Sequence, residues 1–78
     1  MAEEIIVYTQ PGCPPCDAAK EYLTQKGVAF TLKNIQEDPA AIQELISLGS
    51  QSTPTIKMGD KVMIGFRKNE LAEWIGQA

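Results

Sequence analysis

Hydrophobic and polar residues change their period several times along the chain, and each change marks a new element. Residues 4–9 form an apolar run rich in β-branched side chains, which predicts a buried strand. From residue 13 to about residue 26, apolar residues recur at helical spacing, so we expect a helix there. Gly27 is a residue type that often follows the end of such a helix. The apolar face of this helix comprises Ala18, Ala19, Tyr22 and Leu23.

The next segment repeats the strand-then-helix pattern. Residues 28–34 alternate apolar and polar side chains and predict a second strand. A second helix is expected to begin at Asp38 and Pro39, because aspartate caps helix N-termini and proline suits the first helical position. Gly49 ends this helix. Its apolar stripe is expected to be Ile42, Leu45 and Ile46.

The last third of the chain predicts a hairpin and a final helix. Residues 55–58 and 61–64 are short apolar runs that flank a tight Gly-Asp turn, which is the signal of a β-hairpin. A last helix is expected from about Asn69 to Trp74 or Ile75, where apolar residues return to helical spacing.

The predicted order of elements, β-α-β-α-β-β-α, indicates an α/β fold with a mixed four-stranded sheet flanked by helices. We expect strands joined through helices to pair in parallel and the final hairpin to be antiparallel. A chain of 78 residues has room for one hydrophobic core, so residues 1–78 are expected to form one domain. The predicted core includes Tyr22, Phe30, Ile42, Leu45, Leu71 and Trp74.

Charge and composition exclude several classes of function. Ten acidic and seven basic residues give a net charge of −3, which argues against a nucleic-acid partner. The apolar runs are far shorter than the roughly 20 residues of a membrane-spanning helix, so no membrane association is expected. No secretion signal is visible at the start of the sequence, and we expect a cytoplasmic protein. The absence of histidine excludes Cys–His, Ser–His–Asp and histidine-ligated metal chemistry.

The two cysteines, Cys13 and Cys16, carry the candidate chemistry. They follow the first predicted strand and begin the first predicted helix. A helix N-terminus presents unpaired N–H groups and a partial positive charge, which stabilise a thiolate. Cys13, at the exposed end of the helix, is therefore expected to attack a disulfide. Cys16, shielded in the first turn, is expected to resolve the mixed disulfide.

Four neighbouring residues are expected to tune this pair. Pro14 and Pro15 fit the first helical positions, but each lacks an N–H that could point at the Cys13 sulfur. Asp17 adds a negative charge to the first turn, and Gln10 supplies no cation. A modestly stabilised thiolate makes the dithiol easier to oxidise. We therefore expect a reductant toward the thioredoxin end of the scale, about −270 mV, rather than the oxidising end, about −120 mV.

Two metal-binding classes also use a C-x-x-C motif. A structural zinc site needs four ligands, and this chain has no further Cys and no His, so zinc would require a site shared in a dimer. Copper(I) chaperones place the motif after their first strand, and two thiolates suit that metal. They usually carry Met two residues before the first Cys, where this chain has Pro11, and they end in a strand rather than in a helix. No metal is expected.

The segment from Tyr8 to Cys16, Tyr-Thr-Gln-Pro-Gly-Cys-Pro-Pro-Cys, resembles the active-site segment of glutaredoxins. Thr53-Pro54, about forty residues later, is similar to the Thr-Pro of the thioredoxin superfamily. The resemblance covers essentially the whole chain and implies a compact thioredoxin fold of the glutaredoxin type. It also implies that the Thr53–Pro54 peptide is cis, lies beside the cysteines and pairs with the substrate backbone. Tyr8 is assigned to the same substrate contact.

The subgroup is indicated by a second set of positions. Glutathione-dependent glutaredoxins usually have Lys where this chain has Gln10, an aromatic residue where it has Pro15, and acidic residues after the last strand. Gly65, Phe66 and Arg67 are instead similar to a stretch of NrdH-redoxins, which supply electrons to ribonucleotide reductase and are reduced by thioredoxin reductase. On this resemblance, the three residues form the other wall of a shallow substrate groove.

The sequence therefore predicts a thiol–disulfide oxidoreductase that reduces disulfides of proteins or small molecules through Cys13 and Cys16. The expected partners are a disulfide-bearing protein, with ribonucleotide reductase as the candidate, and thioredoxin reductase as the electron donor. No tightly bound cofactor is expected, because the exchange occurs between sulfur atoms. The alternatives are a glutaredoxin with glutathione as co-substrate and a copper chaperone. We expect a monomer.

Overall fold

A computed structural model describes residues 4–76 of the chain. The elements follow the predicted order β-α-β-α-β-β-α, and the two hairpin strands have the predicted bounds. In chain order the elements are β1 (Ile5–Thr9), α1 (Pro14–Gln25), β2 (Thr31–Asn34), α2 (Pro39–Ser47), β3 (Thr55–Met58), β4 (Lys61–Ile64) and α3 (Lys68–Gly76).

The four strands form one mixed sheet in the order β2-β1-β3-β4, which confirms the predicted α/β class. β1 pairs in parallel with β2, with Thr9 opposite Asn34, and β3 pairs antiparallel with β4. The prediction that all strands joined through helices pair in parallel is wrong for β3. This strand pairs antiparallel with β1, and its first residue, Thr55, lies opposite Tyr8 near the end of β1.

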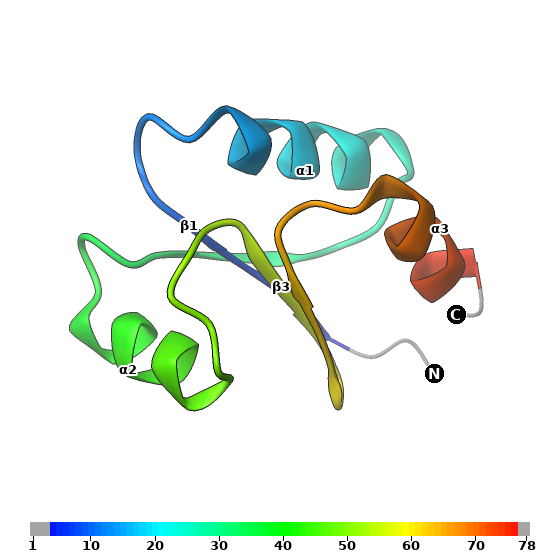
Figure 1. Ribbon diagram of the computed structural model, residues 1–78. Helices are drawn as coiled ribbons and strands as arrows, with labels where there is room; N and C mark the ends of the chain where they lie inside the picture. The colour runs from blue at the N-terminus through cyan, green and yellow to red at the C-terminus, as the bar shows by residue number, and fades with distance from the viewer. Residues whose placement is uncertain (1–3, 77–78) are drawn as a thin grey trace.

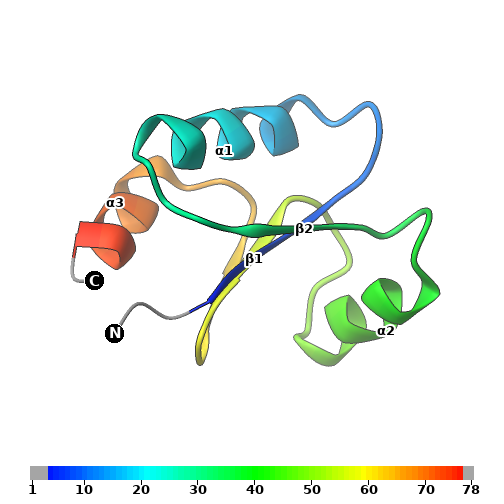
Figure 2. The same cartoon turned by 180° about the vertical axis from the view of Figure 1, so that it is seen from behind.

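The path of the chain around α2 explains the reversed strand. β1 and β2 both end at the same edge of the sheet, where Thr9 pairs with Asn34. α1 returns the chain to the opposite edge, so β2 runs parallel to β1 (Figures 1 and 2). α2 and the loop after it bring the chain back to the edge that it had just left. β3 therefore begins where β1 and β2 end and runs in the opposite direction.

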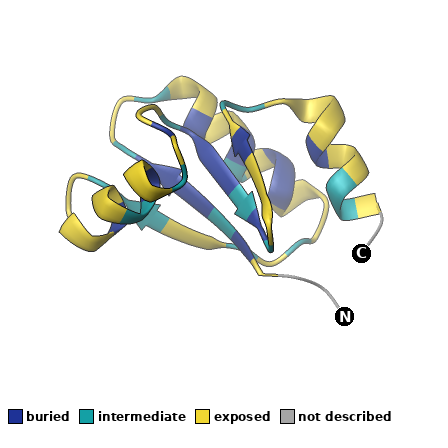
Figure 3. Cartoon of the chain, turned by 60° about the horizontal axis from the view of Figure 1, so that its bottom comes forward, coloured by how far each residue is buried: buried dark blue, intermediate teal, exposed yellow. Residues whose placement is uncertain are grey.

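The helices cover both faces of the sheet. α1 and α3 lie on one face and α2 lies on the other (Figures 1 and 2). The buried residues lie along the central strands and the inner sides of the helices (Figure 3). The larger core cluster, under α1 and α3, contains Ile5, Val7, Ala19, Tyr22, Leu23, Ile56, Met58, Met63 and Leu71, with Phe30 and Trp74 packed partly buried against it.

The smaller cluster, under α2, is narrower than the sequence predicts. Leu45 is 2% exposed and Ala41 is fully buried. Ile42 and Ile46, expected in the buried stripe, are 38% and 55% exposed. A nine-residue helix that packs on one face of a small sheet buries only one line of side chains. Leu48, after the helix, completes the packed surface from a partly buried position.

Local contacts set the ends of the elements. The Asp38 carboxylate accepts a hydrogen bond from the Ala40 amide at 3.0 Å, as expected for the N-cap of α2. β2 starts three residues later than predicted because Val28 is still tied to the end of α1, where its amide donates to the Leu23 carbonyl at 3.1 Å. Gly27 between them adopts a positive φ of 69°, which favours glycine. None of the helices in residues 4–76 has the length and apolar character needed to cross a bilayer.

Candidate redox site

Cys13 and Cys16 lie at the N-terminus of α1 and are joined by a disulfide. Cys13 is the N-cap residue, with an extended backbone, and is half-buried. Cys16 lies in the first turn and is completely buried, as predicted for a shielded second thiol. The Cys16 amide donates a hydrogen bond to the Cys13 sulfur at 3.3 Å. The same amide lies 3.0 Å from the Cys13 carbonyl oxygen, so this N–H at the start of the helix is shared between that oxygen and the more accessible sulfur atom.

The residues expected to tune the pair lie close to it along the chain. Pro14 and Pro15 occupy the first helical positions and are exposed. The Asp17 amide donates to the Cys13 carbonyl at 3.2 Å, so this N–H serves the helix rather than the sulfur. The Asp17 carboxylate pairs with Lys20 at 3.1 Å on the surface of α1. Gln10 is half-buried in the segment between β1 and the cysteine pair.

The Thr53–Pro54 segment lies beside the cysteines although it is forty residues distant in sequence. Its peptide bond is cis, which confirms the expectation drawn from the resemblance. The Thr53 hydroxyl donates to the Cys13 sulfur at 3.7 Å, and Pro54, directly before β3, is buried. The fold brings these two segments together because β1, which leads to the cysteines, pairs with β3, which follows the proline.

Of the three predicted groove residues after β4, Gly65 is in direct contact with the site. Its amide donates to the Pro54 carbonyl at 2.7 Å, and its φ of 89° favours glycine. Phe66 packs against Tyr22 of α1, with ring centroids 5.8 Å apart. The Arg67 guanidinium pairs with Glu70 at 3.1 Å and is exposed. Phe66 therefore contacts α1, and Arg67 contacts α3.

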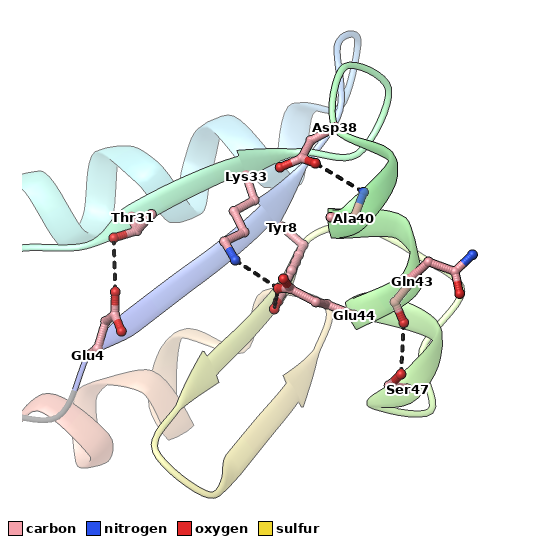
Figure 4. A network of polar contacts seen from close by, with 9 residues as sticks. All are labelled: Glu4, Tyr8, Thr31, Lys33, Asp38, Ala40, Gln43, Glu44 and Ser47. Atoms are coloured by element: carbon pink, nitrogen blue, oxygen red, sulfur yellow. Dashed lines mark hydrogen bonds and ion pairs between the residues drawn. The ribbon is translucent and has the colours of Figure 1, made fainter.

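Tyr8 is placed away from the substrate contact to which the sequence assigned it, and that assignment is corrected. Its side chain is 1% exposed and lies between the sheet and α2. Its hydroxyl donates to the Glu44 carboxylate at 2.8 Å, and the same carboxylate oxygen accepts from Lys33 at 2.8 Å (Figure 4). Successive side chains along a strand point to opposite faces of the sheet, and the motif alone did not show which face Tyr8 takes.

The electrostatics of this network follow from its geometry. Burial, with a smaller effect of Glu44, raises the pKa of Tyr8 to about 12. The hydrogen bonds from Lys33 and Tyr8 lower the pKa of Glu44, and the bond to Glu44 raises the pKa of Lys33. The charged pair and the neutral phenol are thus the stable forms at neutral pH.

Two site residues were missed by the sequence reasoning. Ser50 and Thr55 are 2% and 0% exposed, and their hydroxyl oxygens lie 2.8 Å apart beneath the Thr53–Pro54 segment. The available signal was a concentration of hydroxyl residues around one proline, at positions 50, 52, 53 and 55. Hydroxyl residues are common in exposed loops, so this composition alone did not indicate burial.

No group of three or more His, Cys, Asp and Glu side chains within residues 4–76 is arranged to hold a metal ion. The cysteine pair places two sulfur atoms at the N-terminus of α1. The Cys13 sulfur belongs to a half-buried residue, and Cys16 is completely buried. This arrangement suits thiol–disulfide exchange.

Comparisons with known proteins agree with this geometry. The family model described as Glutaredoxin matches residues 5–63. A glutaredoxin-like protein NrdH from Lactococcus lactis subsp. cremoris is 33% identical over 88% of this chain and 96% of its own length. The structure of the thioredoxin-like protein BC3987 is 39% identical, has a TM-score of 0.87 and is matched over 90% of this chain and 97% of its own. NrdH-redoxin from Escherichia coli, whose structure is described as explaining a thioredoxin-like activity profile, is 28% identical with a TM-score of 0.83, over 90% of this chain and 92% of its own.

Proposed function

We propose that this chain, which belongs to the glutaredoxin family of thiol–disulfide oxidoreductases, is a dithiol electron carrier of the NrdH-redoxin kind. In this role it accepts electrons from thioredoxin reductase and reduces a protein disulfide, with ribonucleotide reductase as the proposed client. The observation that carries the proposal is the Cys13–Cys16 disulfide at the N-terminus of α1, beside Thr53.

The proposed reaction is a pair of sulfur exchanges. In the reduced protein the Cys13 thiolate attacks one sulfur of the client disulfide, and a mixed disulfide forms as the other client sulfur leaves and takes up a proton. The Cys16 thiol then loses its proton and attacks the Cys13 sulfur. This step releases the second client thiol and leaves the Cys13–Cys16 disulfide. Two electrons and two protons pass to the client.

Thr53 is the proposed contact for the client backbone. Within residues 4–76, its amide and carbonyl take part in no backbone–backbone hydrogen bond, so both groups remain available to an extended segment. The flanking Pro54 carbonyl is already bound by the Gly65 amide. Gly65, and beyond it Phe66 and Arg67, form the proposed second wall of the contact surface.

The choice of electron donor rests on three positions. Gln10 and Pro15 stand where glutathione-dependent relatives usually carry a cation and an aromatic ring, and Arg67 lies where they carry acidic residues. Each difference removes a favourable contact with glutathione, whose carboxylates, peptide and amine need those groups. Electron transfer from thioredoxin reductase does not require these glutathione-binding groups. The proposed carrier is a monomer that works without a tightly bound cofactor in the cytoplasm, where thiols are kept reduced.

A donor exchange tests this proposal. NADPH oxidation is followed with insulin as a disulfide substrate and this protein as carrier, coupled either to thioredoxin reductase or to glutathione with glutathione reductase. We expect turnover with thioredoxin reductase and turnover near the uncatalysed rate with glutathione. Turnover with glutathione alone would identify a glutathione-dependent glutaredoxin instead and would overturn the proposed donor.

Two cysteine variants are the controls for this assay. Cys13→Ser is expected to lose turnover with either donor, because it lacks the attacking sulfur. Cys16→Ser retains the attacking thiol and is expected to accumulate a mixed disulfide with the client, visible as a band on a non-reducing gel. A trapped species with Cys13→Ser instead would reverse the assigned order of the two sulfurs.

A further inference from the structure

The loop that carries Thr53 is held by buried hydroxyl groups. The Thr55 hydroxyl donates to the Ser52 carbonyl at 2.7 Å, and the Ser52 amide donates to the Ser50 hydroxyl at 3.3 Å. The two hydroxyl oxygens of Ser50 and Thr55 lie 2.8 Å apart. Both the amide and the carbonyl of Ser52, the residue directly before Thr53, are therefore hydrogen-bonded.

The hydrogen atoms of this cluster can be assigned by counting. Each hydroxyl has one hydrogen, and that of Thr55 is directed at the Ser52 carbonyl. The Ser50 hydroxyl therefore donates to the Thr55 oxygen at 2.8 Å, which is shorter than its alternative contact with the Ser52 carbonyl at 3.3 Å. All of these polar atoms then have a partner.

The loop is held on its other side as well. The Gly65 amide donates to the Pro54 carbonyl at 2.7 Å. Thr53 thus lies between two anchored peptide units, Ser52 before it and Pro54 after it. Its hydroxyl is 3.7 Å from the Cys13 sulfur, where it can donate to a thiolate in the reduced protein. A small displacement of Ser52 would alter both the position of this hydroxyl and the backbone that meets the client.

We propose that Ser50 and Thr55 are positioning residues, whose paired hydroxyls fix Thr53 against the Cys13 sulfur and in the geometry that receives a client strand. The proposal rests on the role proposed above for Thr53, but it does not depend on which molecule supplies the electrons. Among the hydrogen bonds of residues 4–76, neither of the two buried hydroxyls is bonded to a sulfur atom. Their action passes through the Ser52 peptide.

The test compares Thr55→Val with Thr55→Ser. Valine keeps the shape of threonine and removes the hydroxyl, whereas serine keeps the hydroxyl. Insulin reduction is measured with dithiothreitol as reductant, so neither donor enters the assay. For Thr55→Val we expect the KM for insulin to rise about tenfold, on the scale of one or two lost hydrogen bonds, with a smaller change in kcat. Thr55→Ser is expected to restore the wild-type KM.

A second measurement follows the sulfur directly. The rate of Cys13 alkylation by iodoacetamide is measured against pH in the reduced protein. We expect the midpoint of this profile to move to higher pH in Thr55→Val and in Ser50→Ala, because the thiolate loses a well-placed donor. Ser47→Ala removes an exposed hydroxyl bonded to the Gln43 carbonyl on α2, and both readouts are expected to match the wild type.

The outcomes separate positioning from mere stability. A lower melting temperature with unchanged KM and unchanged alkylation profile in Thr55→Val would overturn the proposal. Should that variant fail to fold, amide exchange in the unmodified protein decides the matter. We expect the Ser52 amide to exchange slowly, and exchange at the rate of an unstructured peptide would overturn the proposal. Failure of the donor exchange described above would leave these results unaffected.

Discussion

At the scale of single residues, the reactivity of the site depends on the few donors that reach the Cys13 sulfur. The structure directs the Cys16 amide and the Thr53 hydroxyl at this atom, at 3.3 and 3.7 Å. Pro14 and Pro15 have no N–H to offer, and the Asp17 amide bonds the Cys13 carbonyl. Because the donors are few and their distances are longer than those of strong hydrogen bonds, we expect the Cys13 thiolate of the reduced protein to be only modestly stabilised.

The reduction potential is the prediction that belongs to this scale. A modestly stabilised thiolate favours oxidation of the dithiol, so we expect a potential near that of thioredoxin, about −270 mV. Asp17→Asn removes a negative charge from the first turn of α1 and should shift the potential by about 10 mV in the positive direction, the scale of an exposed charge.

Equilibration of the protein against dithiothreitol redox buffers measures both values. Glu21→Gln, which removes an exposed charge about one turn further along α1, is the matched control and should leave the potential unchanged. A wild-type potential above the glutaredoxin range, higher than about −200 mV, would contradict the prediction.

At the scale of elements, one carboxylate joins α2 to two strands. Glu44 on α2 accepts hydrogen bonds from Tyr8 on β1 and from Lys33 on β2, both at 2.8 Å (Figure 4). α2 buries few apolar side chains, so this polar contact is an important part of its attachment to the sheet. The loop after α2 leads to Thr53, and the attachment of α2 therefore limits how far that loop can move.

The pH dependence of stability tests this attachment. Because the pKa of Glu44 is lowered below 4.5 in the folded protein, its contribution is fully present above that pH and is lost as the pH falls through the folded value. Glu44→Gln should therefore unfold at a lower urea concentration than the wild type at pH 7. The difference should shrink at pH 3. An equal difference at both values would show that the charge of Glu44 does not hold α2.

At the scale of the whole molecule, the sheet separates two unequal cores. The larger cluster lies under α1 and α3, and the smaller one under α2. A chain of this size has little stability in reserve, so single side chains in the larger cluster matter greatly. Leu71 is the residue of α3 that is completely buried, and it connects this helix to the rest of the cluster.

Paired alanine substitutions measure this difference. Leu71→Ala leaves a cavity in the larger core and is expected to lower the free energy of unfolding by about 2–5 kcal/mol. Ile46→Ala removes a side chain that is 55% exposed and should change it by about 0.5 kcal/mol or less. Urea denaturation followed by circular dichroism reports both values. Similar losses in the two variants would show that the apolar face of α2 is covered in solution.

Local patterns predicted the elements well, because caps, turns and periodicity act within a few residues. The hairpin strands and the start of α2 at Pro39 follow from such signals. The direction of β3 depended on the path of the chain around α2, which no local pattern records. The exposure of Ile46 depended on how much of the sheet a short helix covers, which is also a property of the assembled fold.

The candidate site was predictable where a motif carried it. Cys13, Cys16 and the Thr53–Pro54 peptide were found from residue type, spacing and resemblance, and the structure brings them together. Tyr8 was misplaced because its motif does not specify a face of the sheet. Ser50 and Thr55 were missed because a buried hydroxyl pair is defined by its partners in space.

The bond between the Gly65 amide and the Pro54 carbonyl has a consequence for the choice of clients. The Pro54 carbonyl is already hydrogen-bonded, and proline has no N–H. Under the proposed function, the backbone groups of this loop that an incoming chain can bind are therefore the amide and carbonyl of Thr53. Hydrogen bonds to the backbone of a single residue depend little on the amino-acid sequence of the client. Under the proposed function, discrimination between clients then depends on how exposed their disulfide is and on side-chain contacts with the second wall of Phe66 and Arg67, and one carrier can serve clients that share no common motif.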